Sequence, residues 1–199
     1  WLFYYPCDQE VMANAIPGNA SFLSIHSDIA GRWEAVKKNP FLPAVLAGAG
    51  LDTNSIRNLL HDDGLSYILR MAGKKLLLTA YTKGMESNGS PAWIFVGWTG
   101  PRTHWMRYVF WSGLAKGFQK ITIEHGRQTW VMGIGNGQFF TVSLSDGYLV
   151  ASISADPLAI RDVLRRKDYR SGGTPLSDES IIAGLKDHQD VWSFSLPSN

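Results

Sequence analysis

The chain has 199 residues, of which 45% are apolar and 12% are aromatic, and its formal net charge is +2. The near balance of 19 basic and 17 acidic residues does not favour nucleic-acid binding, because that needs a clustered basic face. The single cysteine, Cys7, excludes an intrachain disulfide and a multi-cysteine metal site.

The start of the chain is aromatic and uncharged from Trp1 to Pro6. It resembles the outer end of a transmembrane anchor, where Trp and Tyr favour the lipid interface. We therefore interpret residues 1–15 as a lead-in beside an upstream anchor, and residues 16–199 as a single α+β domain. The alternative is that these residues form an ordinary first strand, or that the sequence starts at an arbitrary point of a longer chain. No later segment reaches the roughly twenty apolar residues of a membrane span, so we expect membrane contact only through that anchor.

Alternation and helical spacing predict one strand, several helices and then a hairpin in the first half of the chain. Pro40 ends the first of these helices, and Asp52 or Thr53 begins the last. In chain order the prediction is a strand over 21–27, helices over 29–38 and 41–46, a helical segment from about residue 53 to residue 69 with a break at Asp63-Gly64, and paired strands over 75–82 and 92–99.

The second half predicts a helix, an antiparallel meander and a return to helices. Short turns between the strands imply antiparallel neighbours. Asp156-Pro157 is typical of a helix start, with an acidic cap before proline. In chain order the prediction is a helix over 102–114, strands over 118–125, 129–134, 139–144 and 148–153, helices over 156–167 and 177–185, and a last strand over 191–195.

These elements predict an α+β fold, an antiparallel sheet with helices packed mainly on one face. The order of strand, helix and paired strands recurs loosely with a period near 75 residues. Two similar halves, with sub-repeats over 16–99 and 92–166, are therefore compatible with the sequence.

Three short sequence motifs resemble those of a known family. They are Pro17-Gly18-Asn19-Ala20 before the first strand, Lys38-Asn39-Pro40-Phe41-Leu42 after the first helix, and the later phrase 152–157. The chain resembles an uncharacterised family of bacterial membrane-anchored exported proteins with an extracytoplasmic α+β domain of unknown function. The resemblance implies a location in the periplasm or at the cell surface, tethered to the membrane, and it supplies no catalytic residues.

The sequence offers no convincing catalytic, cofactor or metal motif. The glycines of 133–137 lie between two strands and so favour a hairpin turn over a phosphate-binding loop. His61-Asp62-Asp63 is typical of a solvated helix end, because adjacent helical residues point in different directions. No serine lies in the Gly-x-Ser-x-Gly pattern of a nucleophile elbow. We therefore assign no catalytic, cofactor-binding or metal-ligating residue. We expect a binding domain rather than an enzyme.

The aromatic residues give the one functional hypothesis. Core packing is expected for most of the eight tryptophans. The helix over 102–114 is apolar nearly all round, so Trp105, Tyr108 and Trp111 are predicted as an interaction surface. This favours a non-enzymatic interaction domain of the cell envelope that binds another protein or its own copy. A glycan- or apolar-ligand-binding module with a Trp-lined groove, or an unrecognised hydrolase, is the alternative.

Overall fold

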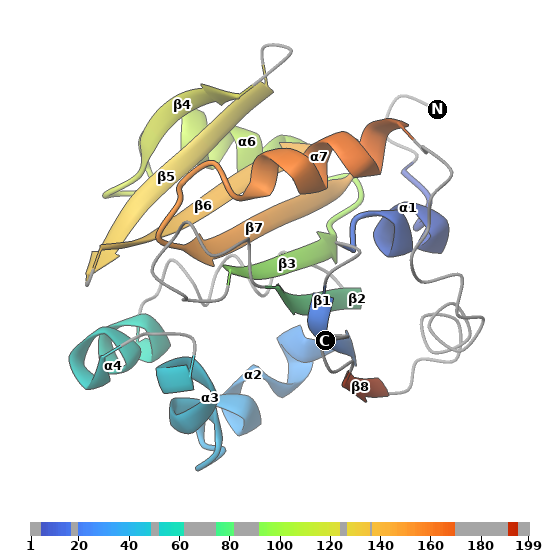
Figure 1. The fold of residues 1–199 in the computed structure, drawn as a ribbon. Helices are drawn as coiled ribbons and strands as arrows, with labels where there is room; N and C mark the ends of the chain where they lie inside the picture. The colour runs from blue at the N-terminus through green and yellow to red at the C-terminus, as the bar shows by residue number, and fades with distance from the viewer. Residues whose placement is uncertain are drawn as a thin grey trace.

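The computed structural model describes residues 5–16, 20–48, 52–61, 75–81, 92–123, 127–135, 137–169 and 191–194. Eight strands of this part of the chain form one sheet in the order β4-β5-β6-β7-β3-β2-β1-β8 (Figure 1). The strands are β1 (Ala20–Ser27), β2 (Lys75–Tyr81), β3 (Ala92–Trp98), β4 (Gln119–Ile123), β5 (Arg127–Gly135), β6 (Gln138–Ser145), β7 (Tyr148–Ser154) and β8 (Val191–Phe194). The helices are α1 (Gln9–Asn14), α2 (Ile29–Lys37), α3 (Leu42–Gly48), α4 (Thr53–His61), α6 (Arg102–Trp111) and α7 (Ile160–Tyr169).

The predicted strands and their antiparallel pairing are confirmed. Strands β4 to β7 form the expected meander, and β2 and β3 form the expected pair. The turn between β6 and β7 consists of Asp146 and Gly147, whose φ angles are 51° and 84°. Two positive φ angles are what a type I′ hairpin turn requires, and Asp-Gly is a preferred pair for it.

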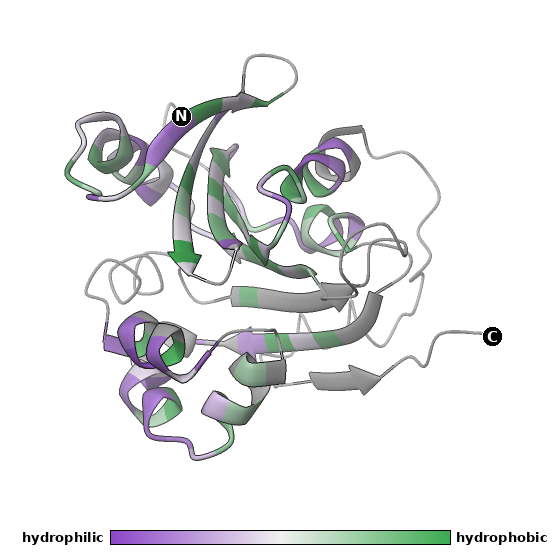
Figure 2. Cartoon of the chain, turned by 60° about the vertical axis from the view of Figure 1, so that its left-hand side comes forward, coloured by the Kyte–Doolittle hydropathy of each residue, from purple (hydrophilic) through white to green (hydrophobic). Residues whose placement is uncertain are grey.

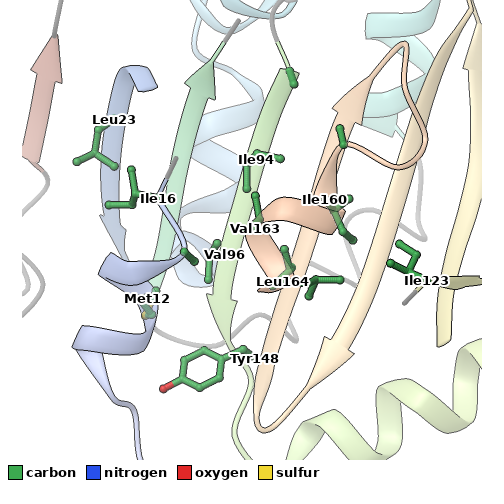
Figure 3. Close-up of a cluster of buried hydrophobic side chains, with 14 of the residues drawn as sticks. Met12, Ile16, Leu23, Ile94, Val96, Ile123, Tyr148, Ile160, Val163 and Leu164 are labelled. Atoms are coloured by element: carbon green, nitrogen blue, oxygen red, sulfur yellow. The ribbon is translucent and has the colours of Figure 1, made fainter. Parts of the chain in front are cut away.

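Strand β7 is buried along its whole length because helices cover both faces of the sheet. Helices α1 and α7 pack on one face, where Met12, Val150 and Ile160 belong to one apolar cluster (Figure 3). Helices α2, α4 and α6 pack on the other face. Figure 2 shows the matching division of hydrophobic and hydrophilic residues around the helices. The α+β class is confirmed; three helices share one face as expected, and α1 and α7 cover the other.

The helix α1 lies within the stretch that the sequence analysis treats as a lead-in. The side chain of Asp8 caps it by accepting hydrogen bonds from the backbone N–H groups of Glu10 and Val11. Met12 and Ile16 are fully buried in the cluster on the α7 side of the sheet. Six residues make less than two turns, too few for a helical period to be recognised in the sequence. The core therefore begins earlier along the chain than residue 16.

The helical segment predicted after Asp52 or Thr53 begins as α4 at Thr53, and its residues 62–69 lie outside the described residues. Two other predicted helices differ at their ends. α7 begins at Ile160 rather than at Pro157, because Asp156 forms a turn in which its carboxylate accepts from the N–H of Leu158. α6 ends at Trp111 rather than at residue 114, since Gly113 adopts a φ of +75°. The helix predicted over 177–185 lies outside the described residues. No described helix is long and apolar enough to cross a membrane.

Candidate interaction surface

The amino-terminal end of α6 is fixed to the turn between β6 and β7. The N–H groups of Thr99 and Gly100 donate to the carbonyl oxygen of Gly147 at 2.8 and 2.9 Å. The hydroxyl of Thr99 donates to the same carbonyl and lies 2.6 Å from the hydroxyl of Thr103. Both threonines are buried. These hydrogen bonds set the position at which α6 leaves the sheet.

The inner side of α6 packs on the sheet through aromatic and aliphatic contacts. Met106 and Phe110 are buried in the cluster formed with β5, β6 and β7. The ring of Phe110 stacks on Trp130 with centroids 4.9 Å apart and meets the edge of Phe118 at 5.0 Å. Arg107 adds a hydrogen bond from Nη2 to the carbonyl oxygen of Leu144 at 2.9 Å. The helix therefore has a complete core contact on this side.

The outer side of α6 carries large side chains that are exposed. The exposed fractions are 54% for Trp105, 49% for Tyr108 and 70% for Trp111, and 64% for Leu114 just beyond the helix. Residues three apart lie on the same side of a helix, here opposite Met106. The rings of Trp105 and Tyr108 stack with centroids 5.5 Å apart. We call Trp105, Tyr108, Trp111 and Leu114 the aromatic surface.

Four further tryptophans lie in or beside the core. Trp33 and Trp130 are buried, and Trp93 and Trp98 are partly buried and pack against the core clusters. Core packing is thus observed for four of the six tryptophans whose burial is described, and Trp105 and Trp111 are the exposed two. α6 is apolar nearly all round because it carries two sets of large apolar side chains. The inner set packs on the sheet, and the outer set is exposed to solvent.

The segment that contains α6 is basic. Residues 92–123 hold four of the 19 basic residues, Arg102, Arg107, Lys116 and Lys120, and none of the 17 acidic ones. All four are exposed. The exposed Asp146 lies in the turn that fixes the first residues of α6, at the opposite end of the helix from Trp111. A positive potential is therefore expected around the carboxyl end of the aromatic surface.

The amino-terminal stretch of the described chain is attached beside the first turn of α6. The hydroxyl of Tyr5 lies 3.0 Å from Nε2 of His104, and their rings are 5.6 Å apart. The indole N–H of Trp98 donates to the carbonyl oxygen of Tyr5 at 3.0 Å. The hydroxyl of Tyr148 accepts from the N–H of Asp8 at 2.7 Å and donates to its carbonyl at 3.0 Å.

Burial raises the pKa of Tyr148 from its ordinary value of 10.0 to about 12, against the opposing effect of its hydrogen bond with the Asp8 backbone. The phenol therefore stays protonated, and able to donate, well above neutral pH. The sequence contains no signal for these contacts, because their partners are 93 to 140 residues apart.

The other residues weighed in the sequence do not gather into a site in the part of the chain that is described. His61 is exposed at the end of α4, whereas Asp62 and Asp63 lie outside the described residues. His26 on β1 contacts the hydroxyl of Ser24. Gly133 and Gly135 lie at the end of β5 and pair with β6, and Gly137 lies in the turn that joins the two strands, in keeping with a hairpin rather than a phosphate-binding loop. No group of three or more metal-ligating side chains occurs among the described residues.

The comparisons with known proteins add nothing to this geometry. No family model matches the chain, and neither a curated protein nor a solved structure matches it significantly. The resemblance to bacterial exported proteins therefore stays a prediction from the three sequence phrases. The function has to be argued from the aromatic surface itself.

Proposed function

We propose that this chain is a non-enzymatic interaction domain that docks through the aromatic surface, and that it works outside the cytoplasm in the bacterial cell envelope. One observation carries the docking proposal: α6 holds to the sheet by Met106 and Phe110, yet it presents Trp105, Tyr108 and Trp111 to solvent. The location rests on the sequence resemblance and on the aromatic start of the chain.

The energetic argument concerns side chains that folding leaves uncovered. Complete burial of a large apolar side chain stabilises a protein by about 1.5–3 kcal/mol. The side chains of the aromatic surface are 49–70% exposed, so they lack about half or more of this gain in the isolated domain, and a partner that covered them would supply it. Trp and Tyr are also enriched among the residues that dominate binding energy. The aromatic surface is therefore better suited to a partner than to the solvent.

The shape of this surface favours docking over the binding of a small ligand. A glycan or an apolar ligand is usually held in a concave pocket with a few converging polar groups. Trp105, Tyr108 and Trp111 instead lie along the outer, convex side of one helix. A convex row of aromatic rings fits a groove or a flat surface on a partner.

Site-specific photocrosslinking in cells that produce the chain tests the proposal. A benzophenone amino acid replaces Tyr108 in one variant and Phe41 in a control variant, because Phe41 is 74% exposed and lies outside α6. We expect a discrete crosslinked product from position 108 that is lost when Trp105→Ser and Trp111→Ser are added. Absence of that product, or an equal product from position 41, would contradict the proposal.

A further inference from the structure

We propose that the partner of the aromatic surface is an anionic lipid membrane surface, on which α6 lies with its aromatic rings at the level of the headgroups. This inference rests on the proposed function, because it names the partner of the same surface. It departs from the expectation that membrane contact comes only through an upstream anchor, since the folded domain itself would also touch the lipid.

The first argument is the chemistry of the exposed side chains. Trp and Tyr combine an apolar ring with a polar N–H or O–H group, and both are enriched at the membrane–water interface. Leu114 is exposed just beyond the end of α6 and adds an entirely apolar group. Interfacial helices bind in this way, with the helix axis in the membrane plane and one side in the headgroup region.

The second argument is charge complementarity. Residues 92–123 carry four basic side chains and no acidic one. Arg107 is hydrogen-bonded to Leu144 on the inner side of α6, so Arg102, Lys116 and Lys120 are the exposed charges that would attract an anionic surface. A second copy of the chain is a poorer partner, because pairing the two aromatic surfaces would also bring the basic residues of both copies together. Like charges at an interface oppose association.

The third argument is where the chain reaches this part of the fold. Tyr5 contacts His104 in the first turn of α6, next to Trp105. Tyr5 is partly exposed there, and its phenol is a further side chain of the kind that favours the membrane–water interface, beside the aromatic surface.

The expected binding is shallow and reversible. A helix of ten residues offers a small apolar area, and its attraction to anionic lipid falls within a Debye length of the surface. Binding should therefore need both the aromatic rings and the lipid charge, and it should weaken as the salt concentration rises.

Vesicle cosedimentation with the 199-residue chain tests the inference. One set of vesicles contains phosphatidylglycerol and phosphatidylcholine, and the other contains phosphatidylcholine alone. We expect binding to the anionic vesicles that high salt weakens, and roughly tenfold weaker binding by a Trp105→Ser, Trp111→Ser variant. Lys116→Gln, Lys120→Gln should weaken binding to the anionic vesicles alone. Phe41→Ser is the matched control and should bind as the unaltered chain does.

The possible failures can be told apart. Circular dichroism identifies a double variant that does not fold, and Trp111→Ser alone then takes its place. If a folded variant without Trp105 and Trp111, or without Trp111 alone, sedimented with the anionic vesicles as well as the unaltered chain does, the lipid assignment would be overturned. No sedimentation of the unaltered chain would overturn it too. If position 108 still crosslinked to a protein in cells, the docking surface would stand and its partner would be that protein. Absence of both signals would overturn the docking surface as well.

Discussion

Tyr148 shows how a single residue holds the amino-terminal stretch to the sheet. Its buried hydroxyl both accepts from and donates to the backbone of Asp8, which caps α1. A buried phenol that donates to a carbonyl must stay protonated, and burial raises its pKa to about 12. The attachment of α1 therefore depends on pH at the alkaline end of the range.

Replacement of Tyr148 by Phe should lower the free energy of unfolding by about 1–3 kcal/mol near neutral pH, because the N–H and carbonyl of Asp8 lose their partner. Urea unfolding measures this loss. In the unaltered chain the unfolded state releases the phenol proton near pH 10, before the folded state does at about 12. The free energy of unfolding should therefore fall as the pH rises through this interval.

The Tyr148→Phe variant lacks that group, so its stability should fall less steeply over the same interval. Tyr108→Phe is the control, because Tyr108 is exposed on α6. Identical alkaline slopes for Tyr148→Phe and the unaltered chain would contradict the assigned role of Tyr148.

Contacts of this kind could not be predicted from the sequence. Tyr5 meets His104 and Asp8 meets Tyr148 only after the whole sheet has formed. The exposure of Trp105 and Trp111 was predictable, because their helix has more apolar circumference than one core contact can cover. Sequence periodicity thus identified the surface but not the attachment beside it.

At the scale of elements, α6 divides into an inner side that stabilises the fold and an outer side that does not. Met106→Ala should lower the free energy of unfolding by about 2–5 kcal/mol, because the side chain is fully buried. Trp111→Ala should change it by less than about 0.5 kcal/mol, since the indole is mostly exposed.

Urea unfolding followed by circular dichroism measures both variants. A Trp111→Ala variant as unstable as Met106→Ala would mean that the indole belongs to the core. The aromatic surface would then lose its main member, and both proposals would lose their support.

The strands were predictable to within about two residues because alternation and turn residues agreed, as at Asp146-Gly147 between β6 and β7. α1 could not be predicted in this way, because six residues are too few to show a helical period. Only the structure reveals its cap at Asp8 and the burial of Met12. Short elements that depend on long-range packing are therefore the ones that sequence reasoning misses.

At the scale of the whole molecule, the sheet joins the two parts of the chain that the loose sequence period suggests. β3 pairs with β2 on one side and with β7 on the other, so the sheet is continuous from β4 to β8. Both faces of β7 are buried, one beneath α7 and the other beside α6. A perturbation on one face should therefore be felt on the other, and the described sheet should unfold as one unit.

Ile160→Ala tests this cooperativity, because Ile160 is fully buried beneath α7 on the face opposite Trp130. The lost contacts should lower the free energy of unfolding by about 2–5 kcal/mol. In a Trp98→Phe background, tryptophan fluorescence reports mainly on the α6 side of the sheet, because Trp98 packs against the cluster of Ile160 whereas Trp130 belongs to the cluster beside α6. Circular dichroism reports on the whole fold. Both signals should shift to the same lower urea midpoint. A shift in circular dichroism with unchanged fluorescence would mean that the two layers unfold separately.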